Sequence, residues 1–118
     1  MKMSISGRHL NVTDDVRAWA EKKFSKLEKY FRREAEAQLT FSSMKHGSMV
    51  KLEATIHHRG WVYRTETVNH DPLSVIDKAV DVIDRQIRRN KAKLEKKFHS
   101  GAFDNIEAGS GLEASDHR

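Results

Sequence analysis

Positively charged side chains are the residues of this sequence with the clearest potential for chemistry. The segment DRQIRRNKAKLEKK, residues 84–97, contains seven lysines and arginines against two acidic residues, and isoleucine and leucine recur in it at helical spacing. Ammonium and guanidinium groups at this density bind polyanions through hydrogen bonds to phosphate oxygens. The segment is therefore either an ordinary solvated helix face or half of a surface that holds polyphosphate.

The charge of the whole chain bears on this choice. The 118 residues carry a net charge of +5, but residues 100–118 contain four acidic residues and a single arginine. Residues 1–99 therefore hold 21 basic and 13 acidic residues, a net charge of +8. A domain this basic favours an anionic partner, with nucleic acid ahead of a membrane surface.

Composition limits the class of protein. A chain of 118 residues, 37% hydrophobic and 33% charged, predicts one domain with a modest core. The absence of cysteine excludes disulfides and thiolate metal sites and fits a reducing cytoplasm, where we expect the protein to be located. The sequence has no apolar run of the roughly 20 residues that a membrane span needs, and its first residues lack the apolar stretch that is typical of a signal peptide.

Two helices must position the cations. The first is predicted from Asp14 to about Arg33, because Thr13 can cap it and acidic residues follow at its positive end. Its apolar stripe is Val16, Ala20, Phe24, Leu27 and Phe31. The second is predicted from Pro72 to about Phe98, after the capping carboxylate of Asp71. Its apolar side is Leu73, Ile76, Val80, Ile83, Ile87, Leu94 and Phe98, and its last turns are cationic enough to project beyond the sheet.

Strand patterns separate these helices. Alternation of apolar and polar residues predicts strands at 2–7, 37–41, 50–57 and 61–69, with turns at HGS and HRG. The order β-α-β-β-β-α predicts an α+β fold in which two helices pack on one face of a four-stranded, mostly antiparallel sheet. Residues 1–99 form this domain, and residues 100–118 are predicted to be a flexible acidic tail or the start of a linker. The other sheet face should meet water through Glu36, Gln38, Thr40, Lys51, Glu53 and Thr55.

Helical geometry sorts the cations into two rows. On the first helix, Lys22, Lys26, Lys29 and Arg33 fall within an arc of roughly 60°. On the second, Arg85, Arg88, Arg89, Lys93 and Lys96 fall within roughly 140°, with Lys91 and Lys97 at the flanks. If the helices lie side by side, we expect the two rows to merge into one continuous positive groove or ridge. Such a surface suits duplex or folded RNA, which can be gripped through phosphate and 2′-OH contacts.

Other chemistry has weaker support. His57 and His58 are adjacent in a strand and point to opposite faces, so we expect no metal site. Trp61 and Tyr63 share a strand face, where aromatic residues usually pack although they can also stack on bases, and Trp19 is predicted to be core. No Gly-rich phosphate loop, nucleophile motif or carboxylate pair is present, so we expect neither a cofactor nor enzymatic activity.

Two stretches resemble a known family. ISGRHLNVTDDVRAWAEKKFSKLEKYF (5–31) and HDPLSVIDKAVDVIDRQIRRNKAKL (70–94) are similar to the ribosome hibernation-promoting factor family, also called ribosome-associated inhibitor or sigma-54 modulation proteins. The similarity covers about residues 3–98 and is most specific in KLEKYF and RQIRRNKAKL, preceded by GRHLNVT. The chain departs from the family at Pro72-Leu73, where members commonly have methionine and tyrosine.

The resemblance implies a β-α-β-β-β-α domain that binds small-subunit ribosomal RNA in the decoding channel of idle ribosomes. There it overlaps the sites of messenger RNA and transfer RNA. The family's basic positions fall on Lys23, Lys26, Lys29, Arg85, Arg89, Lys91 and Lys93, with Arg88 beside them. Together with the two helical rows, the predicted RNA-binding residues are Lys22, Lys23, Lys26, Lys29, Arg33, Arg85, Arg88, Arg89, Lys91, Lys93 and Lys96.

The expected partner is therefore the small ribosomal subunit and its RNA. We expect the chain to be monomeric, with dimerisation of ribosomes only where a C-terminal domain follows, as in the long form of the family. Two alternatives remain open on the sequence: a general double-stranded-RNA-binding module, and a protein-interaction module that acts on a transcription factor. A membrane-surface role is disfavoured, because both basic helices should bury their apolar stripes in the core.

Overall fold

The secondary-structure elements follow the predicted order, with one short 3₁₀-helix added. The computed structural model describes residues 1–31 and 35–99, with side chains as far as Leu94. The elements are β1 (Lys2–Arg8), α1 (Asp14–Phe24), η1 (Ser25–Tyr30), β2 (Glu36–Met44), β3 (Met49–His58), β4 (Trp61–Asn69) and α2 (Pro72–His99). This order confirms the predicted α+β class. Arg33 and the predicted tail at 100–118 lie outside the described residues.

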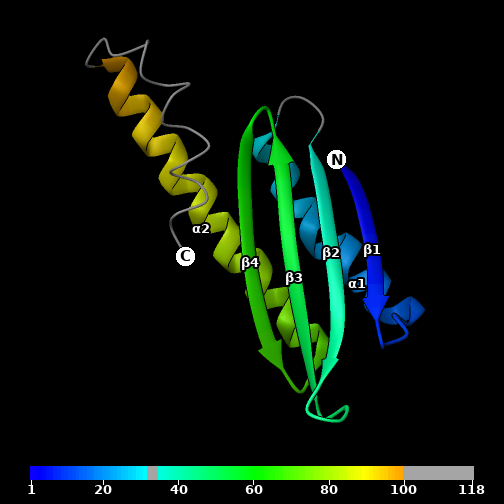
Figure 1. Cartoon of the computed structure of the whole chain (residues 1–118). Helices are drawn as coiled ribbons and strands as arrows, with labels where there is room; N and C mark the ends of the chain where they lie inside the picture. The colour runs from blue at the N-terminus through cyan, green and yellow to red at the C-terminus, as the bar shows by residue number, and fades with distance from the viewer. Residues whose placement is uncertain (32–34, 100–118) are drawn as a thin grey trace.

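The strands form one sheet in the order β1-β2-β3-β4. Short turns join β2, β3 and β4, which pair antiparallel, whereas β1 pairs parallel to β2 across the α1 connection. Both helices cover the same face of this sheet, and α2 runs back alongside β4 and extends beyond the sheet (Figure 1). Leu39, Leu52 and Ile56 point toward the helices and are buried. The predicted polar positions on β2 and β3 lie on the opposite, more exposed face.

The first helix begins as predicted but ends earlier. The Thr13 hydroxyl accepts a hydrogen bond from the backbone N–H of Val16, and Asp14 and Asp15 occupy the first turn. The α-helix ends at Phe24, and the chain continues as η1 to Tyr30, so the prediction of one helix to about Arg33 was wrong. The Ser25 hydroxyl donates to the Glu21 carbonyl oxygen, a bond that competes with regular helix geometry. At Phe31 the backbone is extended (φ −118°, ψ 114°), which ends the helical segment.

The second helix matches its predicted start and length. Asp71 accepts hydrogen bonds from the Leu73 N–H and the Ser74 hydroxyl, each within 3.1 Å. Its buried apolar residues are Val75, Ile76, Ala79, Ile83 and Ile87. The prediction that Leu73 is core was wrong, because this first-turn side chain is 38% exposed. Val80 and Leu94 are only half-buried, and the Phe98 side chain lies outside the described part of the chain.

Two buried polar side chains fasten α2 to the edge strand β4. The Gln86 amide donates to the backbone carbonyl of Arg64 at 2.9 Å, and the Asn90 amide donates to the Tyr63 hydroxyl at 2.8 Å. Neither residue was predicted to be buried, because polar side chains on an amphipathic helix normally lie on its solvent side. Their bonds fix the rotation of α2 about its own axis.

Two further hydrogen bonds join α1 and η1 to α2. The Trp19 indole donates to Asp77 at 2.9 Å, and the Tyr30 hydroxyl donates to Asp84 at 2.5 Å. Trp19 is therefore half-buried between the helices and is not the core residue that was predicted. The bond to Asp84, followed by burial, raises the pKa of Tyr30, and burial raises the pKa of Tyr63.

The β3–β4 hairpin closes through a two-residue turn. Arg59 and Gly60 have φ values of 53° and 88°. Positive φ at both central residues is characteristic of a type I′ turn, whose twist matches that of the strands it joins. Glycine adopts this conformation freely and arginine seldom does, so Arg59 occupies an unusual backbone position at the tip of the hairpin.

Ile83 should be a major determinant of stability, because it is fully buried between α2 and the sheet. We expect Ile83→Ala to lower the free energy of unfolding by about 2–5 kcal/mol, since burial is reduced and a cavity remains. Urea denaturation measures this change as a shift of the midpoint at constant slope. Leu73→Ala is the matched control and should cost much less. Equal destabilisation of the two variants would contradict this account of the core.

Alkaline pH should destabilise the fold through its two tyrosines. Both folded-state pKa values are raised above the ordinary value of 10.0, so the folded protein holds the phenolic protons more tightly than the unfolded chain. The free energy of unfolding should be unaffected by these groups below that pH and should fall as the pH rises through the folded-state values. Ultraviolet titration of tyrosinate should show native protein ionising at higher pH than urea-unfolded protein. Asp84→Asn should shift the Tyr30 transition downward, and an unshifted curve would contradict the Tyr30–Asp84 bond.

Candidate nucleic-acid interface

The first row of cations lies on α1 and η1. Lys22, Lys26 and Lys29 are exposed, whereas Lys23 is half-buried. The Nζ atoms of Lys22 and Lys23 lie 5.6 and 4.6 Å from the centre of the Trp19 ring. The pKa of Lys26 is lowered, first by the charge of Lys23 and by a hydrogen bond with it. Slight desolvation and the charge of Lys22 lower it further. The lysines are therefore close enough to repel one another, and an anion near them would relieve that repulsion.

The second row lies on α2. Arg85, Arg88, Arg89 and Lys91 are exposed, and Lys93 is half-buried. Lys96 lies within the helix, but its side chain is outside the described part of the chain, as are Arg33 and the side chain of Lys97. Arg85 pairs with Asp81 at 3.3 Å and Arg88 with Asp84 at 3.0 Å. Such exposed i,i+4 pairs contribute only about 0.3–0.5 kcal/mol, so a phosphate group can replace the carboxylate as partner.

A groove of about 320 Å³ runs between the two rows, and its walls differ in charge. Lys23, Lys26 and Lys29 line the side formed by α1 and η1, and Asp77, Asp81 and Asp84 line the side formed by α2. The expectation that the two rows merge into one unbroken positive surface was therefore wrong. A row of carboxylates separates them.

These carboxylates have structural roles that explain their position. Asp77 accepts the Trp19 indole hydrogen bond, and Asp84 accepts hydrogen bonds from both Tyr30 and Arg88. They join the helices at the place where the helices pack. Beyond Asp84, the next acidic residue of α2 is Glu95. The most strongly positive part of the helix is therefore the stretch from Arg85 to Lys93, near the end of η1.

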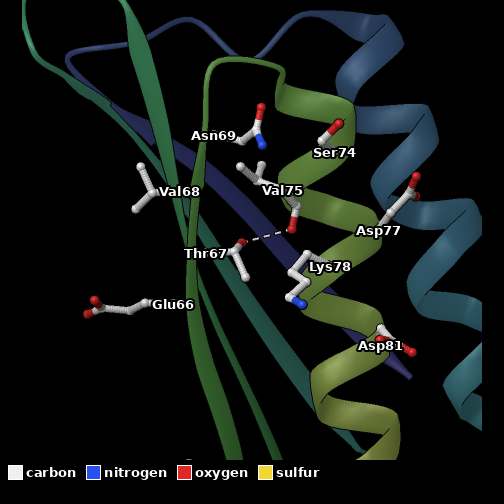
Figure 2. A pocket seen from close by; sticks show the side chains of 9 residues that line it. All are labelled: Glu66, Thr67, Val68, Asn69, Ser74, Val75, Asp77, Lys78 and Asp81. Carbon is white, nitrogen blue, oxygen red and sulfur yellow. Dashed lines mark hydrogen bonds between the residues drawn. The ribbon is translucent and has the colours of Figure 1, made fainter.

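A different cavity, of about 810 Å³, lies between β4 and the start of α2. Figure 2 shows its lining, with the Thr67 hydroxyl donating to the Val75 carbonyl oxygen at 2.8 Å. Its charged residues are Glu66, Asp77 and Asp81 against the single cation Lys78, and the Glu66 side chain points away from α2 in the view of Figure 2. Because this lining is net acidic, the cavity does not suit a phosphate backbone.

The remaining predicted features can be placed on the fold. His57 is exposed, and its neighbour His58 is partly buried beside Phe31, with ring centroids 4.6 Å apart. Within the described residues, no group of three His, Asp or Glu side chains is arranged to hold a metal ion. None of the helices over that same part of the chain has the length and apolar character needed to cross a membrane.

Comparison with known proteins shows the family. Residues 3–95 match the family described as sigma 54 modulation protein / S30EA ribosomal protein. The ribosome hibernation promoting factor of Azotobacter vinelandii is 36% identical over 79% of this chain and 85% of its own length. The ribosome hibernation promotion factor of Bacillus subtilis is 32% identical over 83% of this chain and 52% of its own length. The chain thus spans about half the length of the Bacillus relative.

Solved structures agree with this similarity. The N-terminal domain of Thermus thermophilus Protein Y superposes with a TM-score of 0.68 at 30% identity, over 75% of this chain and 98% of that domain. A ribosomal subunit interface protein from Coxiella burnetii has a TM-score of 0.67 at 17% identity, over 78% of this chain and 99% of its own, and shows the shared fold. From its family match, its relatives and its fold, the chain belongs to the sigma 54 modulation protein / S30EA ribosomal protein family, the family of the ribosome hibernation promoting factors.

Proposed function

We propose that this chain binds ribosomal RNA in the decoding channel of the small subunit and silences the ribosome by occupying the sites of messenger RNA and transfer RNA. The chain needs no catalytic group for this, because exclusion is steric. The observation that carries the proposal is the row of exposed cations on α2 in a member of the hibernation factor family.

The strongest RNA contacts are assigned to Arg88, Arg89 and Lys91. Arg89 and Lys91 are exposed, and no ion pair is found for either within the described residues. Arg88 donates to Asp84 through its Nε–H, so the terminal amino groups of its guanidinium retain donors for phosphate. Arg85 and the lysines of α1 and η1 extend the contact to either side of the carboxylate row.

The divided charge pattern also gives a reason for selectivity. A uniform positive surface attracts any polyanion, whereas separate positive rows with carboxylates between them require phosphates at two positions and none at the acidic row. Folded ribosomal RNA presents such fixed positions. We therefore favour the ribosome, which holds its phosphates at fixed positions, over the alternative of a general double-stranded-RNA binder.

Reversing charge on α2 should disrupt the interface. We expect Arg85→Glu with Arg89→Glu to weaken binding to purified small subunits by at least about a hundredfold, because two cations that bind phosphate are replaced by anions that repel it. The slope of log affinity against log salt should fall by about two, because two fewer phosphates are neutralised. Fluorescence anisotropy of labelled protein over a series of salt concentrations measures both quantities.

The matched control reverses two cations on the opposite face of the sheet. Lys2 and Arg64 are exposed there, on β1 and β4. Lys2→Glu with Arg64→Glu changes the net charge by the same amount and should leave subunit affinity within a fewfold of the parent protein. Unchanged binding by a folded Arg85/Arg89 variant, or equal weakening in the two double variants, would remove the support for an interface on α2.

Occupancy of the decoding channel should be mutually exclusive with its usual RNA ligands. Small subunits preloaded with messenger RNA and a transfer RNA in the P position should bind the chain much more weakly than empty subunits. Sedimentation through a sucrose gradient with labelled chain measures this difference, and free duplex RNA added as competitor should displace little of the bound chain. Simultaneous binding of the chain and both RNAs would place the interface elsewhere on the ribosome.

A further inference from the structure

A third cavity, of about 350 Å³, lies where the β3–β4 turn, the end of η1 and the middle of α2 meet. We call it the hairpin cavity. Its lining includes the aromatic rings of Phe31, His58, Trp61 and Tyr63 and the cations Arg59 and Lys91. Its volume is near the lower end of the range of about 300–1,000 Å³ that is typical of small-ligand sites.

The aromatic rings provide faces for a flat ligand. Trp61 stacks on Tyr63 with ring centroids 6.5 Å apart and planes 14° from parallel, and the ring centroid of Phe31 lies 4.6 Å from that of His58 and 6.4 Å from that of Tyr63. Phe31, His58 and Trp61 are each only half-buried, so part of their surface remains available. A planar ring that packs against their exposed surface gains stacking contacts.

Two polar atoms of the lining have no partner in the described structure. Asn90 is 6% exposed, and its amide nitrogen already donates to Tyr63, which leaves its Oδ1 buried without a hydrogen bond. The Nε2 atom of His58 is likewise buried without a hydrogen bond. A buried acceptor without a donor is destabilising, so a ligand that donates a hydrogen bond to Asn90 Oδ1 would remove that cost.

The charge of the cavity selects the sign of the ligand. Burial, followed by the charges of Arg59 and Lys91, lowers the pKa of His58, so the imidazole is neutral in a positive potential. An aromatic pocket alone would suit a cation such as a quaternary ammonium. The nearby guanidinium and ammonium groups make an anionic ligand the better match.

We propose that the hairpin cavity is a nucleotide site, which stacks one unpaired base against its aromatic rings, accepts a hydrogen bond from the base edge at Asn90 Oδ1, and holds the adjoining phosphate with Arg59 and Lys91. This inference deepens the proposed function, because ribosomal RNA would supply the nucleotide. A free nucleotide has the same chemistry, and the two sources are distinguished by the experiment.

The test uses Trp19→Phe protein, in which Trp61 is the only tryptophan of the chain. The probe is a short oligonucleotide of abasic units with one central adenosine, and its reference is the same oligonucleotide without any base. We expect the adenosine to quench Trp61 fluorescence and to tighten binding by about five- to a hundredfold, the range for stacking of one base. Equal affinity for the two oligonucleotides without quenching would overturn the proposal.

Matched variants separate this site from general charge. Trp61→Leu should remove most of the preference for the adenosine probe. Lys91→Ala should weaken the binding of both oligonucleotides, whereas Lys78→Ala, an exposed lysine of the same helix beside the acidic cavity, should leave both affinities and the preference unchanged. Thermal melting establishes that each variant is folded. A preference that survives in folded Trp61→Leu protein, or equal affinities of the Lys91→Ala and Lys78→Ala proteins for the probe, would overturn the assignment.

The affinity of the protein for free adenosine monophosphate distinguishes the two sources of the nucleotide. Binding as tight as that of the adenosine probe supports the site with a free nucleotide as ligand, and much weaker binding supports RNA as the source. Tighter binding of an acidic, phenylalanine-containing peptide than of the probe would overturn the site in favour of a protein partner. Loss of ribosome binding with the adenosine preference intact would remove the proposed function and leave the nucleotide site standing.

Discussion

The packing of α2 on the sheet is the contact on which the arrangement of charge depends. A helix can present a cationic row to a ligand only if its rotation about its own axis is fixed, and apolar burial alone tolerates some rotation. The buried Gln86 and Asn90 make directional hydrogen bonds to β4, and Asp71 fixes the start of the helix. These bonds hold the row from Arg85 to Lys93 away from the core.

The same helix must also limit repulsion among its cations. Like charges at i,i+4 positions destabilise a helix by a few tenths of a kcal/mol each. Asp81 and Asp84 offset part of this cost by pairing with Arg85 and Arg88, and Asp84 also receives the Tyr30 hydrogen bond. The carboxylates that interrupt the positive surface are therefore part of what allows the helices to pack side by side. A polyanion that contacts both cation rows has to accommodate that acidic row.

Much of the fold was predictable because its signals are local. Thr13 and Asp71 cap helices through neighbouring backbone groups, and alternation in the strands specifies which face is buried. Most of the errors arose where tertiary contacts decide. The exposure of Leu73 and the burial of Asn90 depend on elements distant in sequence, whereas the end of α1 at Phe24 coincides with a local Ser25 hydrogen bond that apolar periodicity does not reveal. The cation rows were found from helical periodicity, but the acidic row between them was not, because it becomes apparent only when the two helices are side by side.

The backbone of Arg59 has a consequence for engineering this protein. An L-residue with a side chain in the left-handed region costs roughly 1–2 kcal/mol, which glycine avoids. Arg59→Gly should therefore yield a more heat-resistant hairpin while deleting one of the two cations beside the aromatic cavity. Selection for thermostability alone would favour this replacement, whereas selection for ligand affinity would oppose it. At this position glycine serves resistance to heat, whereas arginine serves the binding of an anion that we propose for the cavity.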